Sequence, residues 1–283
     1  MLQYKMINFI ETETPIQICD IGASNIEKTD FIDELLDNTS SRIIGFEPNK
    51  EEFEKLNKND PKRKYYNFGI GDGTEKILNI CKSVGMSSFL EPDLDYLKNF
   101  HNFKDWSKII KRTKVKTKKL TEIDDEIDFL KIDVQGYESE IINHGKDKIK
   151  DCLVVQLEAS PTPLYKNEKT FAYTILQLEK LGFTLHMFNN VDTRSFKPTI
   201  IENNNRIGLH HLFQLDCVLI KNLEAINIYE VEKLKKLILI MFHSFKSIDL
   251  VDYLISLLDK KSNKNHIDEY RKIVPEVKFK KIY

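Results

Sequence analysis

The sequence lacks a long apolar run, and it lacks an excess of charge of either sign. Its longest apolar run, Leu237 to Phe242, is far too short to span a bilayer, and the N-terminus holds no sustained apolar stretch typical of a secretion signal. Lys and Arg total 43 against 44 for Asp and Glu, so no global field draws the chain to nucleic acid or anionic lipid. We therefore expect a cytoplasmic protein with no membrane insertion and no nucleic-acid partner.

Closely spaced cysteines are also absent. The four cysteines are far apart and form no CxxC pair, and three of them sit in apolar, strand-like runs: Cys19, Cys81, Cys152 and Cys217. This pattern favours buried free thiols in a reducing compartment over disulfides or a zinc site. The remaining composition is ordinary, because 283 residues with 41% hydrophobic side chains can bury one large core.

Short apolar runs alternate with helical patterns along the chain, which is typical of βαβ units and an α/β fold. The predicted strands are 15–21, 42–46, 64–70, 75–81, 128–133, 152–157, 183–188 and 212–220, and a less regular insert covers 82–112. The predicted helices between them are 29–36, 50–56, 94–100, 137–144 and 171–181. From residue 226 the composition changes to two amphipathic helices, 231–245 and 250–258. We predict a domain over 1–225 and a C-terminal helical appendix over 226–283, with a homodimer through these helices as a further possibility.

The turn after the first predicted strand reads Asp20-Ile21-Gly22-Ala23-Ser24-Asn25. Gly22 would let the backbone approach a bound small molecule closely, because glycine has no Cβ. A dinucleotide pyrophosphate normally needs a G-x-G-x-x-G turn that leads directly into a helix. Here Ser24 stands at the second glycine position and no glycine follows. The sequence therefore argues against NAD or FAD.

Two more acids follow the next predicted strands. Glu47, before Pro48, lies roughly 20 residues beyond the glycine turn, where a carboxylate typically binds the ribose hydroxyls. Asp72, between Gly71 and Gly73, lies in a flexible turn and could accept a hydrogen bond from an adenine amine. Each acid alone could be a turn or capping residue. Together with Asp20 they indicate a site for an adenosine without a pyrophosphate.

The segment DFLKIDVQGYE, from Asp128 to Glu138, places Lys131 inside an apolar strand. A lysine in the middle of a sheet is costly unless it is paired, so we interpret it as part of a site. Alternation puts Lys131, Asp133 and Gln135 on one face if the strand stays extended. Glu158 ends the next strand, and the two acids flank one pocket if these strands are parallel neighbours. Lys131 could then neutralise Glu158 or Asp133.

Six segments resemble, in order and spacing, the FkbM-type family of S-adenosylmethionine-dependent methyltransferases. They are ICDIGASN, RIIGFEPNKEEFEKL, YNFGIGDG, GMSSFLEPD, FLKIDVQGYE and VVQLEASPTPLYKNEKTFA. The resemblance spans about Pro15 to Lys221, and its IDVQGYE and GFEP segments are specific to the family. It implies a Rossmann-like class I methyltransferase, with a mostly parallel central sheet and helices on both faces. The family usually shows G-A-N-x-G after the first strand, where this chain has Gly22-Ala23-Ser24-Asn25-Ile26.

By this resemblance the cofactor is S-adenosylmethionine, with the 20–25 loop near its methionine part, Glu47 on its ribose and Asp72 near its adenine. The predicted cofactor-binding residues are Asp20, Gly22, Ala23, Ser24, Asn25, Glu47, Pro48, Gly71, Asp72 and Asp133. Because a sulfonium is already a good leaving group, the protein needs mainly to align an acceptor and remove its proton. The predicted catalytic residues are Asp133, Lys131 and Glu158, which could instead form a structural ion network.

The expected acceptor is a hydroxyl on a sugar, glycan or small metabolite. The alternatives are an RNA or protein acceptor, a non-catalytic adenosine-binding domain and a nucleotide-dependent oxidoreductase. His210 and His211 could supply a base, although solvated or capping histidines are more common. The seven basic residues within 108–119 could hold an anionic acceptor or form the solvated face of a strand. We expect no metal, because no histidine supplies a clear third ligand to an Asp/Glu pair.

Overall fold

The structure, a computed structural model, describes residues 7–24, 30–56 and 59–274. Its strands are β1 Gln17–Ile21, β2 Arg42–Phe46, β3 Arg63–Tyr66, β4 Gly69–Ile70, β5 Glu75–Cys81, β6 Ile109–Lys118, β7 Phe129–Ile132, β8 Val154–Ala159, β9 Phe183–Thr193 and β10 Leu212–Lys221. Its helices are α1 Asp30–Asn38, α2 Lys50–Lys55, α3 Leu94–Leu97, α4 Phe103–Trp106, α5 Glu138–Ile149, α6 Phe171–Glu179, α7 Leu223–Asn227, α8 Val231–His243, α9 Ile248–Ser262 and α10 Ile267–Ile273.

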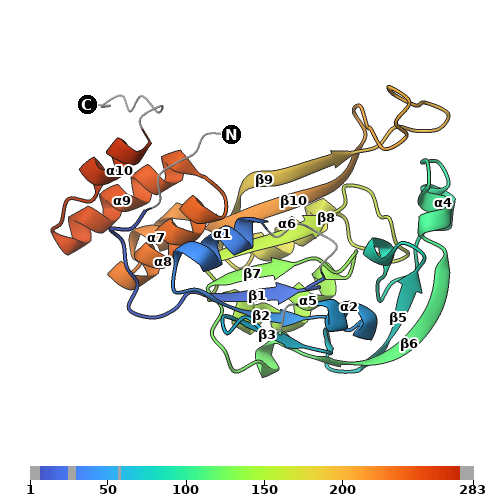
Figure 1. Ribbon diagram of the computed structural model, residues 1–283, viewed down its shortest axis with the longest axis horizontal. Helices are drawn as coiled ribbons and strands as arrows, with labels where there is room; N and C mark the ends of the chain where they lie inside the picture. Colours follow the sequence, from blue (N-terminus) through green and yellow to red (C-terminus); the bar gives the residue numbers. More distant parts are fainter. Residues whose placement is uncertain (1–6, 25–29, 57–58, 275–283) are drawn as a thin grey trace. The chain divides into compact units, whose positions relative to one another are not determined.

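A seven-stranded sheet has the order β3-β2-β1-β7-β8-β10-β9 (Figure 1). The pairs β2/β3, β1/β7 and β7/β8 are parallel, whereas β10 runs antiparallel to β8. Parallel neighbours need crossover connections, and the helices between the strands supply them. The mostly parallel, Rossmann-like architecture predicted from the sequence is confirmed.

The two faces of the central strands differ in chemistry, because successive side chains point to opposite sides. One set of side chains packs in a core with residues of α5 and α6: Cys19, Ile21, Leu130, Ile132, Val155, Leu157, Cys217 and Leu219. The alternate set contains a polar row, since Asp20 lies opposite Lys131 and Lys131 lies opposite Gln156 in the strand register. This row leads directly to the carboxyl ends of β1, β7 and β8.

The predicted strand 64–70 and the predicted insert differ from the observed structure. Residues 64–70 divide into β3, in the large sheet, and β4, in a separate sheet of order β4-β6-β5. The side chain of Asn67, between them, donates a hydrogen bond to the Glu47 carbonyl at 2.8 Å, which turns the chain out of the large sheet. The insert 82–112 contains α3 and α4 and enters β6, which pairs antiparallel with β5 over most of its length. The hydrogen bond from Asn67 connects Glu47, directly after β2, with the residues that precede β4 in the second sheet.

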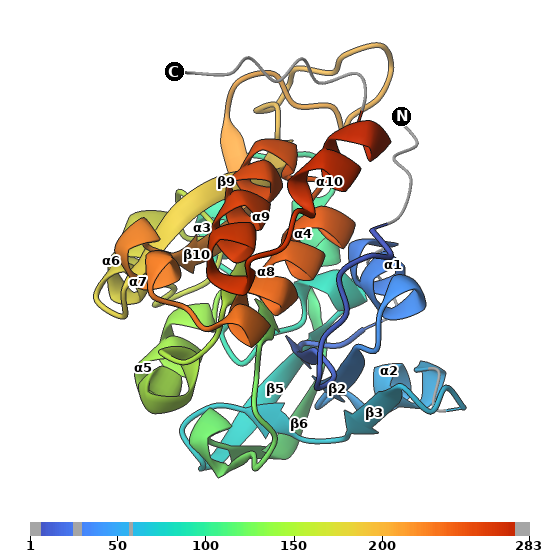
Figure 2. The same ribbon diagram turned by 90° about the vertical axis from the view of Figure 1, so that its left-hand side faces the viewer.

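Contacts within the chain group it into two compact units. Among the described residues, one unit comprises 7–16, 30–42 and 221–274, and the other comprises 17–24, 43–56 and 59–220. Within the first unit, α8 packs on α9 and α1, and α10 packs on α9 (Figure 2). The apolar stripe predicted for the C-terminal helices is buried in α8 and α9. The domain boundary at residue 225 stays a prediction.

Two expectations about the chemistry of the chain can be compared with the structure. All four cysteines are free and buried, as predicted. Across residues 7–24, 30–56 and 59–274, none of the helices has the length and apolar character needed to cross a bilayer.

Candidate active site

A cavity lies at the carboxyl ends of β1, β2 and β7, where ligands bind in open α/β sheets. The space inside it, part of which is open to solvent, is about 670 Å³. The residues that line it are Gly22, Ser24, Glu47, Pro48, Asn49, Glu52, Leu78, Val84, Gly85, Ser87, Ser88, Phe89, Asp133, Val134 and Gln135. Five of the predicted cofactor-binding residues therefore share one cavity: Gly22 and Ser24 after β1, Glu47 and Pro48 after β2, and Asp133 after β7.

Gly22 allows the ends of three strands to come together. Its φ of +89° is in the left-handed region, and a Cβ on Gly22 would lie 1.8 Å from the Asp133 carbonyl oxygen. The N–H groups of Gly22 and Ala23 both donate to the Phe46 carbonyl, at 3.0 and 3.1 Å. Only glycine fits this position. Its closest approach is to the backbone at the end of β7, in addition to the cavity that the sequence analysis expected it to face.

Glu47 places a buried carboxylate in the cavity wall. Glu47 is 7% exposed, and its Oε1 accepts a hydrogen bond from the Asn49 N–H at 2.6 Å. Among the described residues, its Oε2 has no hydrogen-bond partner. Burial raises the pKa of Glu47 to about 8, the Asn49 N–H opposes the rise, and Glu52 adds to it. A ligand that offers hydroxyl donors would satisfy this carboxylate.

Lys131 forms a buried ion-pair network behind the cavity. The residue is 5% exposed, and its Nζ lies 3.4 Å from Oδ1 of Asp20 and 3.5 Å from Oδ2 of Asp133. Burial raises the pKa of Asp20, and the Lys131 ammonium opposes that rise without cancelling it. The sequence analysis gave Asp133 as a possible ion-pair partner of Lys131. The β1/β7 register places Asp20 opposite Lys131, so Asp20 is a second partner. Asp20 itself is not among the residues that line the cavity.

Gln135 joins the two predicted catalytic acids. Its Nε2 donates to Oδ1 of Asp133 at 3.1 Å and to Oε2 of Glu158 at 2.7 Å. Its Oε1 accepts from the Tyr165 hydroxyl at 3.1 Å, which fixes the orientation of the amide. Gln214 donates a second hydrogen bond to Oε2 of Glu158 at 2.6 Å. Since β8 is the parallel neighbour of β7, as the sequence analysis supposed, Asp133 and Glu158 form one polar wall at this edge.

The turn that carries Gln135 is not extended, contrary to the condition set in the sequence analysis. β7 ends at Ile132, and Gln135 has a φ of 56°. Oε1 of the buried Glu138 accepts from the N–H groups of Val134 and Gly136, both at 3.1 Å. Glu138, the last residue of the IDVQGYE motif, thus holds the turn, and its burial raises its pKa to about 8. Sequence reasoning missed this role.

The structure does not bring every predicted cofactor residue to the cavity. Ala23 is buried beside it, and Asn25 lies outside the described residues. Gly71 and Asp72 are not among the lining residues. Oδ1 of Asp72 accepts from the Thr74 N–H at 2.9 Å, and its Oδ2 pairs with Lys76 Nζ at 2.5 Å. The adenine role of Asp72 stays a prediction.

Several lining residues were not expected to belong to a cofactor site. Asn49 and Glu52 come from the start of α2. Leu78 comes from β5, and Val84, Gly85 and residues 87–89 come from the turn after it. The acids of the 50–55 helix carry no sequence signal that distinguishes a buried glutamate from an exposed one.

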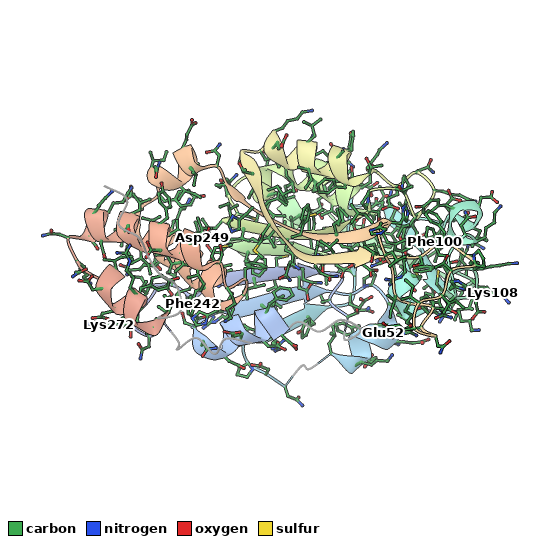
Figure 3. All side chains as sticks on the ribbon, turned by 90° about the horizontal axis from the view of Figure 1, so that it is seen from above. Glu52, Phe100, Lys108, Phe242, Asp249 and Lys272 are labelled. Carbon is green, nitrogen blue, oxygen red and sulfur yellow. The ribbon has the colours of Figure 1, made fainter. Side chains whose placement is uncertain are left out.

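The remaining candidates lie elsewhere. His211 Nε2 is 2.7 Å from the Tyr96 hydroxyl, and its ring stacks on Phe100, which Figure 3 labels within a dense group of side chains. Neither His210 nor His211 lines the cavity. In the basic run, Lys114 pairs with Glu75 at 3.1 Å and is exposed, as on a solvated strand face. Within the described ranges, no group of three or more His, Cys, Asp or Glu side chains could hold a metal ion.

Comparisons with known proteins add to this geometry. A family model described as the methyltransferase FkbM domain matches residues 20–185. A search of curated proteins gave no significant match.

The solved structures similar to the chain include the following three. A methyltransferase FkbM from Methylobacillus flagellatus KT is 10% identical with a TM-score of 0.36, over 73% of this chain and 43% of that one. This chain therefore spans less than half the length of that protein. A putative S-adenosylmethionine dependent methyltransferase from Listeria monocytogenes is 11% identical with a TM-score of 0.37, over 77% and 93% of the two chains. A TehB-like SAM-dependent methyltransferase from Corynebacterium glutamicum ATCC 13032 Kitasato is 8% identical with a TM-score of 0.32, over 73% and 80%.

Proposed function

The chain belongs to the FkbM methyltransferase domain family, and from that premise we propose that it transfers a methyl group from S-adenosylmethionine to a hydroxyl oxygen on a sugar, glycan or small metabolite. The observation that carries the proposal is one cavity with Glu47 at its β2 side and Asp133 at its β7 side. A carboxylate for ribose hydroxyls and a carboxylate for an acceptor proton are the two groups that such a reaction needs.

The residues of the cavity fit S-adenosylmethionine. No lysine or arginine of the described chain lines it, whereas Glu47, Glu52 and Asp133 do. Such a lining favours a cationic ligand and disfavours a pyrophosphate. Pro48, Leu78 and Phe89 supply apolar surface for a base. When bound, this cofactor supplies an activated methyl group on a sulfonium.

We propose that Asp133 is the base that accepts the proton of the acceptor hydroxyl. Its carboxylate lines the cavity and is oriented by the Lys131 ammonium and the Gln135 amide. Glu158, tied to the same amide, extends the polar wall away from the cavity and can accept from a neighbouring acceptor hydroxyl. Lys131 acts in this scheme by balancing charge and does not touch the acceptor.

The test is methyl transfer to an extract of the source organism, with S-adenosylmethionine labelled in its methyl group. We expect the label in a fraction that resists ribonuclease, protease and mild alkali, because a methyl ether survives all three. A sample with Glu47→Ala protein serves as the control. Release of the label by ribonuclease or by protease would show that the acceptor is RNA or protein and would contradict the proposed acceptor. Absence of transfer together with tight binding of S-adenosylhomocysteine would favour a non-catalytic adenosine-binding domain.

Glu47→Ala is expected to weaken the binding of S-adenosylhomocysteine by about 1.5 to 3 kcal/mol, because charge-assisted hydrogen bonds to the ribose are lost. The melting temperature without ligand should change little, since the truncation removes a carboxylate from a cavity wall. Calorimetric titration measures the affinity. Glu51→Ala is the matched control, because its side chain is 75% exposed and lies outside the cavity. Normal affinity in Glu47→Ala, or an unfolded protein, would make Glu47 a structural residue.

The affinity for S-adenosylhomocysteine is expected to rise with pH and to level off above about pH 8. Burial raises the pKa of Glu47 to about 8, so its carboxyl is mostly protonated at neutral pH in the absence of ligand. Hydroxyl donors favour the ionised form, so binding releases a proton, and the affinity gains up to about tenfold per pH unit below this pKa. Calorimetry in two buffers of different ionisation enthalpy counts the proton. Equal proton release in Glu47→Gln would contradict the assignment to Glu47.

We also propose a cytoplasmic location, which the four buried free thiols support. The homodimer through the C-terminal helices stays a prediction, and sedimentation equilibrium tests it.

A further inference from the structure

The cavity has a second buried carboxylate besides Glu47, on the first turns of α2. Glu52 is 3% exposed and lines the cavity, and Figure 3 labels it on α2. Its Oε1 accepts from Lys55 Nζ at 2.5 Å, and the Lys55 side chain is 58% exposed. Among the described residues, Oε2 of Glu52 has no hydrogen-bond partner. One oxygen of this carboxylate is therefore paired with Lys55, and the other can accept a hydrogen bond from a ligand in the cavity.

The order of the strands gives the position of Glu52 in the cavity. β7, β1 and β2 are neighbours in that order, and their ends carry Asp133, Gly22 and Glu47. α2 connects β2 to β3, which lies on the far side of β2 from β7, so we place Glu52 beyond Glu47 in this series. A cofactor with its methyl group at Asp133 and its ribose at Glu47 would have its base at the α2 end.

The chemistry at this end matches one edge of adenine. Oδ1 of Asn49 accepts from the Glu51 N–H at 3.1 Å as the N-cap of α2, which leaves its amide NH₂ as a donor. Nδ2 of Asn49 has no hydrogen-bond partner among the described residues. Adenine has an exocyclic amine, which donates, beside the ring nitrogen N7, which accepts in adenine and hypoxanthine alike. Asn49 as donor and Glu52 as acceptor are complementary to that pair.

We propose that Glu52, together with Asn49, recognises the adenine of the cofactor and sets the base specificity of the site. This inference rests on the proposed function. In hypoxanthine a carbonyl oxygen replaces the amine, and this oxygen would face the Glu52 carboxylate with no proton between them. The adenine role that the sequence analysis gave to Asp72 is a competing assignment. Asp72 is engaged by Thr74 and Lys76 and does not line the cavity.

The experiment is a calorimetric titration of S-adenosylhomocysteine and S-inosylhomocysteine into the full-length protein. The wild type should prefer the adenine ligand by about tenfold or more, since a matched donor and acceptor pair gives that much discrimination. Glu52→Gln is nearly isosteric, and its amide can donate to the hypoxanthine carbonyl. The ratio of the two affinities should therefore fall close to one in this variant, mainly because the inosine ligand gains affinity.

Two variants are controls for this ratio. Glu54→Gln makes the same change at an exposed residue of α2, and Asp72→Asn tests the competing assignment. Both should keep the wild-type ratio. The two affinities are measured on one sample, so a partly unfolded fraction changes the stoichiometry and leaves the ratio unaffected.

An unchanged ratio in Glu52→Gln, a ratio lowered by Asp72→Asn, or equal binding of both ligands by the wild type would overturn the inference. Failure of the wild type to bind S-adenosylhomocysteine at all would instead overturn the proposed function, and the two failures are therefore distinguishable.

Discussion

Lys131→Met is expected to lower the free energy of unfolding by about 3 to 5 kcal/mol, because it leaves buried carboxylates without their counter-charge. The lysine side chain is 7% exposed, and the side chains of its partners Asp20 and Asp133 are 7% and 11% exposed. Methionine fills nearly the same volume, so the loss reports charge rather than packing. Urea denaturation followed by circular dichroism measures the change.

A double variant separates charge from other effects. Lys131→Met combined with Asp20→Asn removes one charge of each sign, and we expect it to recover much of the lost stability. Lys166→Met is the matched control, because Lys166 pairs with Glu91 at the surface and is 60% exposed, and exposed pairs contribute little. If the double variant were no more stable than Lys131→Met alone, the Asp20 pair would not be the reason for the lysine.

Asp133→Asn is expected to lower turnover by about 10² to 10⁴-fold, because the amide can no longer take the proton of the acceptor hydroxyl. The substitution is nearly isosteric and keeps hydrogen-bonding capacity toward Gln135. The affinity for S-adenosylhomocysteine should change much less than turnover. Initial rates with the acceptor found by methyl labelling give the comparison.

Glu158→Gln is the control for this assignment. Glu158 shares the Gln135 amide with Asp133 but is not among the residues that line the cavity. We expect a smaller loss of turnover than in Asp133→Asn. Wild-type turnover in Asp133→Asn would remove its catalytic role and leave Lys131, Asp20 and Asp133 as a structural ion network.

The sequence predicted the fold well because the relevant signals are local. Apolar runs that alternate with helical patterns predicted the α/β class, and strand ends located Gly22, Glu47 and Asp133. These residues do meet in one cavity. The C-terminal edge of a parallel sheet brings strand ends together whatever the details of the loops.

The residues that were missed depend on non-local geometry. The Asp20 and Lys131 pair follows from the β1/β7 register, which a single sequence does not specify. Glu52 lies in KEEFEK, a stretch that looks like an exposed acidic helix. Glu52 shares the cavity wall with Val84, Gly85 and residues 87–89, which are distant in the sequence. Asp72 lies in the expected turn, but its carboxylate forms an ion pair with Lys76, four residues later in the chain.

Calorimetric titration of the wild-type protein with S-adenosylhomocysteine and with NAD tests the central claim, that this acidic cavity is an S-adenosylmethionine site. The absence of basic side chains in the described lining, and the Glu47 carboxylate, predict saturable binding of S-adenosylhomocysteine at one site per chain and no measurable binding of NAD. Tight binding of NAD without a signal for S-adenosylhomocysteine would contradict the account.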